Sequence, residues 1–147
     1  MNNPPKVIVD ADAIIAQANP NDIHHQTATR ISRSLSDMNA QVVYPATAII
    51  ESNAYMQRVL NSTASAYGIA VVLTDPDVEV AEINQMTLKN ALKYFSPTTS
   101  KKNTLFDCVI AAVAEEYEAD AIFSFDKFYK SKGFTLAGEL PQLISAK

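Results

Sequence analysis

The run KVIVD at residues 6–10 constrains the fold more than any other feature, because it is short, apolar and ends in a carboxylate. A continuous apolar run of this length is typical of a strand that is covered on both faces, as in a parallel sheet. We therefore expect a buried strand here. Comparable short runs predict further strands at 40–45, 68–73, 121–125 and 134–137.

Segments with helical periodicity separate these runs, since their apolar residues recur three or four positions apart. The predicted helices cover 12–18, 20–38, 46–60, 75–95 and 104–120, and one or two further helical turns are expected at 127–133. A polar, basic loop is predicted at 96–103. Alternating strands and helices predict an α/β fold, a three-layer α/β/α sandwich with a mainly parallel sheet of about five strands. The length and the lack of repeats or linkers favour a single domain over 1–147.

The composition excludes several classes of protein. No apolar stretch reaches the roughly 20 residues that span a bilayer, and the first residues lack the apolar segment of a secretory signal, so we expect a cytoplasmic protein without a membrane partner. The single cysteine, Cys108, excludes a disulfide framework and a multi-cysteine zinc site, and its apolar surroundings predict burial. Three glycines without a Gly-rich cluster exclude a P-loop and a dinucleotide fingerprint.

The net charge of −4 argues against a protein that binds nucleic acid mainly through an overall positive charge. Several acids, however, occupy places that suggest one shared site. Asp10 and Asp126 directly follow predicted strands, Glu51 lies in the first two turns of the 46–60 helix, and Asp107 lies in the first turn of the 104–120 helix. Because ligands bind outside the carboxyl ends of parallel strands, we expect these four side chains at one edge of the sheet.

Carboxylates gathered in a partly buried site repel one another unless a cation binds them. Oxygen ligands suit Mg²⁺ or Mn²⁺, and such a site supports attack of water on a phosphodiester. Each acid also has a structural interpretation. Asp10 and Asp126 could cap the helices that follow them, Asp107 could form a capping box with Thr104, and Glu51 could face solvent.

Three segments together resemble the acidic motifs of the PIN-domain ribonucleases, in the same order along the chain. They are VIVDADAII, YPATAIIESNAYMQRV and LFDCVIAAVAEEYEADAIFSFDKFYKSKGF. The resemblance implies a parallel sheet flanked by helices, a Mg²⁺- or Mn²⁺-dependent ribonuclease acting on RNA, and a homodimer. A chain of this size is similar to the toxins of VapBC-type toxin–antitoxin pairs, which implies an antitoxin protein as a possible partner.

The resemblance places the four acids of the family on Asp10, Glu51, Asp107 and Asp126, and a common hydroxyl residue on Ser124. Asp10, Asp107 and Asp126 would hold the metal, while Glu51 would ligate it or help to deprotonate the attacking water. The sequence departs from the family pattern at two places. Asp12 stands where a small polar residue is more common, and we expect it to support the site rather than to ligate the metal directly.

The second departure is that no acid follows shortly after Asp126, where Lys127, Phe128 and Tyr129 stand, which weakens the expectation of a tightly bound second metal. Phe128 or Tyr129 could stack on an unpaired base, but core packing is the favoured interpretation. His24 and His25 are expected at or near the surface. Candidates for contacts to substrate phosphates are Lys101, Lys102, Lys127 and Lys130, with Arg30 and Arg33 as further candidates.

Two other functions compete with the nuclease. One is a non-catalytic PIN-like module that binds RNA or protein, although the presence of all four acids gives no sign of lost activity. The other is a small metal-dependent phosphatase of the haloacid dehalogenase type, whose opening motif the Asp10–Asp12 pair resembles. That interpretation leaves Glu51 without a role.

Overall fold

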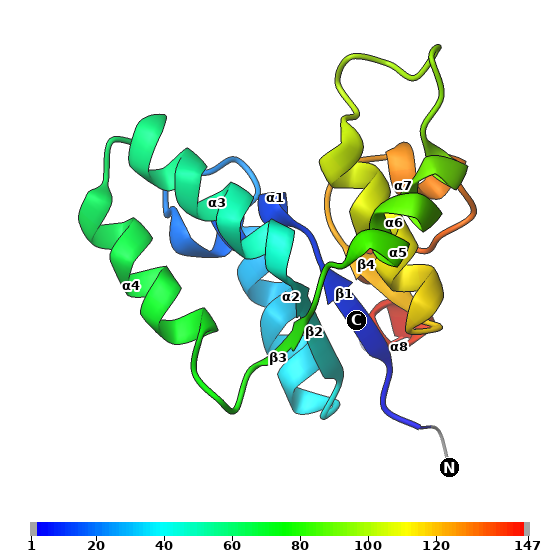
Figure 1. Cartoon of the computed structure of the whole chain (residues 1–147). Coiled ribbons are helices and arrows are strands. Elements are labelled where there is room, and N and C mark those ends of the chain that lie inside the picture. The colour runs from blue at the N-terminus through cyan, green and yellow to red at the C-terminus, as the bar shows by residue number, and fades with distance from the viewer. Residues whose placement is uncertain (1–2, 146–147) are drawn as a thin grey trace.

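The computed structural model describes residues 3–145, and within them the chain forms a parallel sheet of four strands in the order β3-β2-β1-β4 (Figure 1). The bounds of the strands are Lys6–Val9 for β1, Gln41–Pro45 for β2, Glu79–Ala81 for β3 and Ala121–Phe123 for β4. Every neighbouring pair of strands is parallel. The predicted α/β fold is therefore confirmed.

Helices cover both faces of this sheet. Their bounds are Ala11–Ala18 for α1, His25–Asp37 for α2, Ala46–Arg58 for α3, Thr63–Leu73 for α4, Gln85–Ala91 for α5, Leu105–Glu116 for α6, Phe128–Ser131 for α7 and Pro141–Ser145 for α8. The connections from β1 to β2 and from β3 to β4 cross the sheet in opposite directions, so right-handed crossovers place their helices on opposite faces. In Figure 1, α5 and α6 lie in front of the strands, and α3 and α4 extend to one side.

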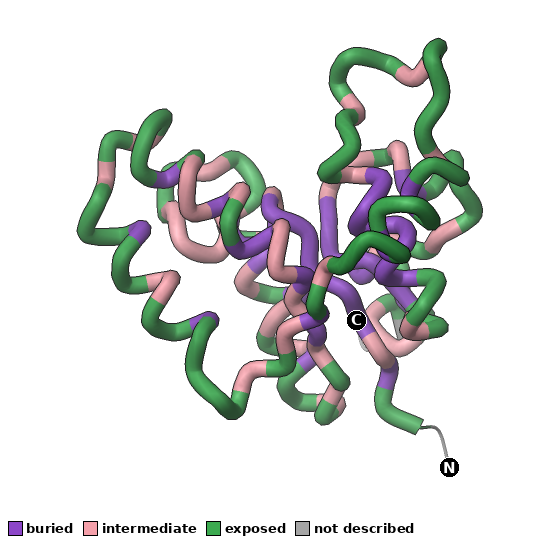
Figure 2. The backbone as a smooth tube through the Cα atoms, in the orientation of Figure 1, coloured by how far each residue is buried: buried purple, intermediate pink, exposed green. Residues whose placement is uncertain are grey.

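The core lies where β1 meets α6. Val7, Ile8 and Val9 are completely buried, as expected for a strand covered on both faces, and the α6 segment 108–114 is buried throughout. Figure 2 shows this buried band at the centre of the fold, while α4 and the loop before α6 are mostly exposed. Full burial of one such aliphatic side chain contributes about 1.5–3 kcal/mol, so this band holds the strand ends in place. None of the helices in residues 3–145 is long and apolar enough to cross a bilayer.

The strand predicted at 68–73 is wrong, and the helix predicted at 75–95 is wrong in its first part. The apolar run at 68–73 is part of helix α4, which begins after Ser62 because the Ser62 hydroxyl accepts a hydrogen bond from the Ser65 N–H. The first part of the predicted 75–95 helix is instead the edge strand β3. Helix α5 starts only after Asn84, whose side chain forms a capping box with Thr87.

The strand predicted at 134–137 is reduced to a single parallel bridge between Leu136 and Ile122, beyond the edge strand β4. The chain then turns into a 3₁₀ helix at Ala137–Glu139. The sheet thus has four strands with a one-residue extension, close to the about five strands expected.

The order of the strands determines where a ligand can bind. The chain builds the sheet outward from β1 to β2 and β3, then returns to place β4 on the other side of β1. The connections after β1 and β4 therefore leave the sheet in different directions, and such a reversal is where open parallel sheets form a ligand-binding crevice. Asp10 follows β1, and Ser124 to Asp126 follow β4, so these residues lie at this crevice.

Candidate active site

Asp10 ends β1 at the crevice, and its side chain is 4% exposed. One carboxylate oxygen accepts a hydrogen bond from the Ala11 N–H at 2.7 Å, which caps helix α1. The other accepts hydrogen bonds from the Tyr129 hydroxyl at 2.7 Å and the Ser124 hydroxyl at 3.1 Å. Burial, followed by the nearby charge of Asp12, raises the pKa of Asp10 well above its usual value. Asp10 thus caps helix α1, and the burial of its negative charge is energetically unfavourable.

Asp12 lies in the first turn of α1 and points toward the loop after β4. Its Oδ2 accepts hydrogen bonds from the Phe125 N–H at 2.8 Å and the Ser124 hydroxyl at 3.0 Å. Its Oδ1 is buried and accepts no well-formed hydrogen bond from the described residues. Burial also raises the pKa of Asp12, and the charge of Asp126 adds to this effect. A buried carboxylate oxygen without a partner is costly and marks a place where a cation would be stabilised.

The Ser124 side chain joins these two acids to the fourth. It is buried, it donates toward both Asp10 and Asp12, and it accepts a hydrogen bond from the Asp126 N–H at 3.1 Å. Because a hydroxyl has one hydrogen, it can satisfy only one of the two carboxylates at a time. The residue therefore fixes the end of β4 against the start of α1.

On the opposite side of the crevice, Asp107 and Asp126 share a donor. The Asn103 amide donates to Asp126 at 2.9 Å and, at the long distance of 3.5 Å, to Asp107. Asp107 also accepts from the Thr104 N–H at 3.0 Å, so the predicted capping interaction at the start of α6 is present. Burial raises the pKa of Asp107, and the charge of Asp126 raises it further.

Glu51 approaches the same cluster from α3 and is half-buried. Burial and the charges of Asp107 and Asp12 raise its pKa to about 7. The five carboxylates, hereafter the acid cluster, therefore come from α1, α3, α6 and the ends of β1 and β4, and they influence one another electrostatically. They are Asp10, Asp12, Glu51, Asp107 and Asp126.

The acid cluster has the donor chemistry that a hard divalent cation needs, since all its ligating atoms are carboxylate oxygens. The unpartnered Oδ1 of Asp12 and the raised pKa values fit a site that binds positive charge. Within residues 3–145, no group of three or more His, Cys, Asp or Glu side chains is arranged to hold an ion as it stands. Hydroxyl and amide hydrogens from Ser124, Tyr129 and Asn103 meet the carboxylates instead.

A PIN-domain family model matches residues 7–134. The chain belongs to the PIN-domain family. This membership confirms the resemblance of the three acidic motifs to the PIN-domain ribonucleases. No curated protein matches the sequence.

Among solved structures, the PIN fold of this chain is similar to that of the Mycobacterium tuberculosis toxin VapC20, described as a toxin that cleaves the sarcin–ricin loop. The TM-score is 0.75 at 19% identity, and the match covers 88% of this chain and 96% of that chain. At this level of identity the likeness supports the fold.

In this PIN domain, the other residues considered from the sequence lie mostly outside the acid cluster. Lys101, Lys102 and Lys127 are exposed, while Lys130 pairs with Glu139 at 3.1 Å. Arg30 and Arg33 are exposed on α2. His24 stacks on the Phe125 ring with centroids 4.2 Å apart, and a His25 ring nitrogen hydrogen-bonds the Ala16 carbonyl, so both have structural contacts near the surface. Cys108 is buried, as expected.

Sequence patterns do not reveal two residues that contact the acids of this PIN site. Tyr129 is completely buried, in agreement with core packing, but its hydroxyl also donates to Asp10 and lies 3.4 Å from Asp107. Burial and the nearby carboxylates raise its pKa well above 10, which keeps this donor protonated. Asn103 falls within the predicted polar loop. Its position directly before the Thr104 cap of α6 is the one signal that could have indicated its role.

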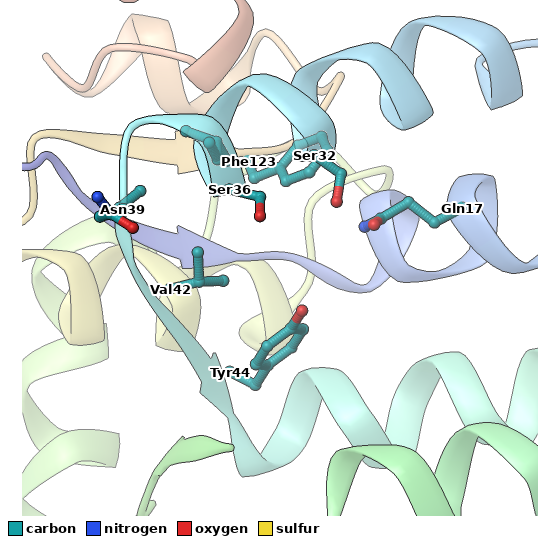
Figure 3. A pocket seen from close by; sticks show the side chains of 9 residues that line it. Gln17, Ser32, Ser36, Asn39, Val42, Tyr44 and Phe123 are labelled. Carbon is teal, nitrogen blue, oxygen red and sulfur yellow. The ribbon is translucent and has the colours of Figure 1, made fainter. Parts of the chain in front are cut away.

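A pocket of about 440 Å³ lies elsewhere in this PIN domain, between α1, α2 and the strands. Figure 3 shows Gln17, Ser32 and Tyr44 around it. None of its lining residues is charged. It lacks the carboxylates that metal-dependent chemistry requires, so the acid cluster is the candidate active site.

Ser124→Ala tests how strongly the hydroxyl of Ser124 holds the cluster together. We expect the metal-free variant to lose about 1–2 kcal/mol of unfolding free energy, because buried carboxylate oxygens lose a donor. Urea unfolding in EDTA measures this loss. Ser36→Ala, at an exposed position on α2, is the matched control and should change stability far less. Equal effects of the two substitutions would contradict the bridging role.

Proposed function

We propose that this PIN domain is a metal-dependent endoribonuclease whose active site is the acid cluster. The observation that carries the proposal is the convergence of five carboxylates at the crevice between β1 and β4, with a buried Asp12 oxygen that has no partner among the described residues. Such a site is unfavourable in a protein that binds no cation, since burial and neighbouring charges raise the pKa values of four of the acids, Asp10, Asp12, Glu51 and Asp107. Membership of the PIN-domain family supports nuclease chemistry over the phosphatase alternative.

In this proposal Asp10, Asp107 and Asp126 hold Mg²⁺ or Mn²⁺, directly or through water. The bound cation would supply Lewis acidity that favours attack of water on the phosphodiester and stabilises the departing oxygen. Glu51 is suited to accept a proton from the attacking water, because it approaches the other acids from α3. In the metal-free protein burial and the charges of Asp107 and Asp12 raise its pKa to about 7, and a bound cation would lower this value. Oδ2 of Asp12 accepts hydrogen bonds from the Phe125 N–H and the Ser124 hydroxyl, so Asp12 positions the loop that carries Asp126. Its unpartnered Oδ1 would accept a hydrogen bond from water on the cation.

The substrate in this proposal is RNA, and the protein is the toxin of a type II toxin–antitoxin pair. The similarity of the fold to VapC20 supports this assignment. An antitoxin encoded in a neighbouring reading frame is the expected partner. Coexpression of that frame with the chain should yield a stable complex and reduced RNA cleavage.

We also propose a homodimer. Ile50 on helix α3 is 66% exposed and Val59, directly after this helix, is 63% exposed, while Tyr67 on helix α4 is 72% exposed. Helices α3 and α4 pack against each other, and contiguous exposed apolar patches are typical of surfaces covered in an assembly. Light scattering on the purified protein measures the mass directly, and a monomer at micromolar concentration would contradict the homodimer.

The nuclease proposal predicts RNA cleavage that depends on added metal. Wild-type protein should cleave single-stranded RNA in Mg²⁺ or Mn²⁺ and should lose this activity in EDTA. A generic phosphomonoester should remain intact under the same conditions. Hydrolysis of the phosphomonoester without RNA cleavage would favour the interpretation as a phosphatase. RNA binding without cleavage in any of these metals would favour the non-catalytic module.

A further inference from the structure

A polar pocket of about 490 Å³ lies next to the acid cluster, between the loop 96–103 and helix α7. Figure 1 shows this loop rising between the end of α5 and the start of α6, close to α7. Hydroxyl residues and two cations make up most of the pocket wall. The hydroxyl residues are Ser96, Thr98, Thr99, Ser100 and Ser131, and the cations are Lys127 and Lys132.

The hydroxyls give the loop a defined shape. The Thr99 hydroxyl accepts a hydrogen bond from the Ser96 N–H at 2.8 Å, and the Ser96 hydroxyl lies 3.1 Å from that of Thr98. The Ser100 hydroxyl accepts from the Lys102 N–H. Each hydroxyl can also donate a hydrogen bond to a ligand, so the pocket presents several donors on an ordered loop.

The two lysines differ from Lys130, which lies between them in the sequence, because neither forms an ion pair with a carboxylate within residues 3–145. Among the described residues, the ion pairs are Lys93 with Glu115 and Lys130 with Glu139. The Lys132 ammonium instead lies 5.5 Å from the centre of the Phe128 ring, and Lys127 is exposed directly after Asp126. Two free ammonium groups beside hydroxyl donors are suited to phosphate oxygens.

Asn103 connects the pocket to the acid cluster. It lines the pocket, and its amide donates to Asp126 and Asp107. A chain whose phosphodiester lies at the acids would therefore reach the pocket with an adjacent nucleotide. The net negative charge of the protein and the acids themselves repel a polyanion, so nearby positive charge is needed to hold it.

We propose that this pocket binds the backbone phosphate of the RNA nucleotide next to the cleaved bond, through Lys127, Lys132 and the hydroxyls of the loop 96–103. The inference rests on the proposed ribonuclease function. It assigns a substrate contact to Lys132, which no sequence pattern singles out. It excludes Lys130 from the residues that contact substrate phosphates, because Lys130 is paired with Glu139.

The test measures binding of a fluorescently labelled single-stranded RNA in Mg²⁺ by anisotropy, with Asp107→Asn present in every protein to prevent cleavage. Adding Lys127→Gln and Lys132→Gln should weaken RNA binding about tenfold. It should also reduce the slope of log affinity against log salt concentration by about 1.4, since each lost phosphate contact to a single strand lowers this slope by about 0.7. Lys130→Gln, on the short helix α7 that the two lysines flank, is the matched control and should change neither quantity. Lys127→Arg with Lys132→Arg should keep both near the parent values.

The outcomes separate the two proposals. Unchanged affinity and salt slope in the Lys127→Gln and Lys132→Gln protein would contradict phosphate binding in the pocket. An equal loss of affinity with Lys130→Gln would contradict it as well. In either case, cleavage by the wild-type protein would leave the nuclease proposal standing. If the parent protein does not bind RNA and the wild type does not cleave it, both proposals fail. Melting temperatures of all variants show whether the fold is retained.

Discussion

Asp10→Asn is expected to lower metal-dependent RNA cleavage by about a thousandfold, whereas Asp12→Asn should retain a measurable fraction of activity. Asp10 is buried at the end of β1 and meets donors from α7 and β4, so it lies at the centre of the proposed site. Loss of several kcal/mol of metal-supplied stabilisation corresponds to about three orders of magnitude in rate. Single-turnover cleavage at saturating Mn²⁺ measures both variants.

The two aspartates differ in what their carboxylates already do. Oδ2 of Asp12 is taken by the Phe125 N–H and the Ser124 hydroxyl, and an asparagine keeps an oxygen that can accept from them. Melting temperatures in EDTA provide the control. Asp10→Asn replaces a carboxylate whose buried charge is unfavourable by a neutral group, so it should not destabilise the metal-free fold. Equal and complete loss of activity in both variants would contradict this ranking.

The metal-free protein should become less stable as the pH rises from 5 to 8. Burial and mutual repulsion raise the pKa values of Asp10, Asp12, Glu51 and Asp107 in the folded state, while the unfolded chain titrates near pH 4. Between these values the folded state holds more protons than the unfolded state, so stability falls as the pH increases. Glu51 extends this range to about pH 7.

We expect the melting temperature in EDTA to drop by about 5–10 °C across this range, since 1 kcal/mol corresponds to about 4 °C for a domain of this size. A cation that binds only the folded state should restore most of the loss, because at a hundred times its dissociation constant it contributes about 2.7 kcal/mol. Glu51→Gln should flatten the metal-free curve near pH 7. A melting temperature that is constant or rises between pH 5 and 8 in EDTA would contradict the account.

Positions set by local rules can be predicted from the sequence. Asp10 and Asp126 follow strands, and Asp107 begins a helix, so the rule for carboxyl ends of parallel strands places all three at one edge of the sheet. Glu51 joins them because α3 starts directly after β2. The structure brings these acids close to Asp12. Ser124 contacts Asp10 and Asp12, Asn103 contacts Asp107 and Asp126, and the charges of Asp107 and Asp12 contribute to the raised pKa of Glu51.

Contacts between distant parts of the chain cannot be predicted in this way. Tyr129 donates to Asp10 across 119 positions, and Asn103 bridges Asp107 and Asp126 from a loop without periodicity. The edge strand β3 is hidden in the sequence because three residues give too short a pattern, and its pairing with β2 decides its conformation. The apolar run at 68–73 is part of a helix because Ser62 caps it.

Cleavage of single-stranded RNA during a Mn²⁺ titration of the EDTA-treated protein tests the central claim most directly. Wild-type protein should gain activity with the metal, and Asp107→Asn should stay about a thousandfold lower at every concentration. Asp120→Asn is the matched control, because this exposed aspartate lies directly before β4 and its side chain accepts a hydrogen bond from the Lys6 N–H. It should follow the wild type. Cleavage in EDTA, or full activity of Asp107→Asn, would contradict a metal-dependent site at the acid cluster.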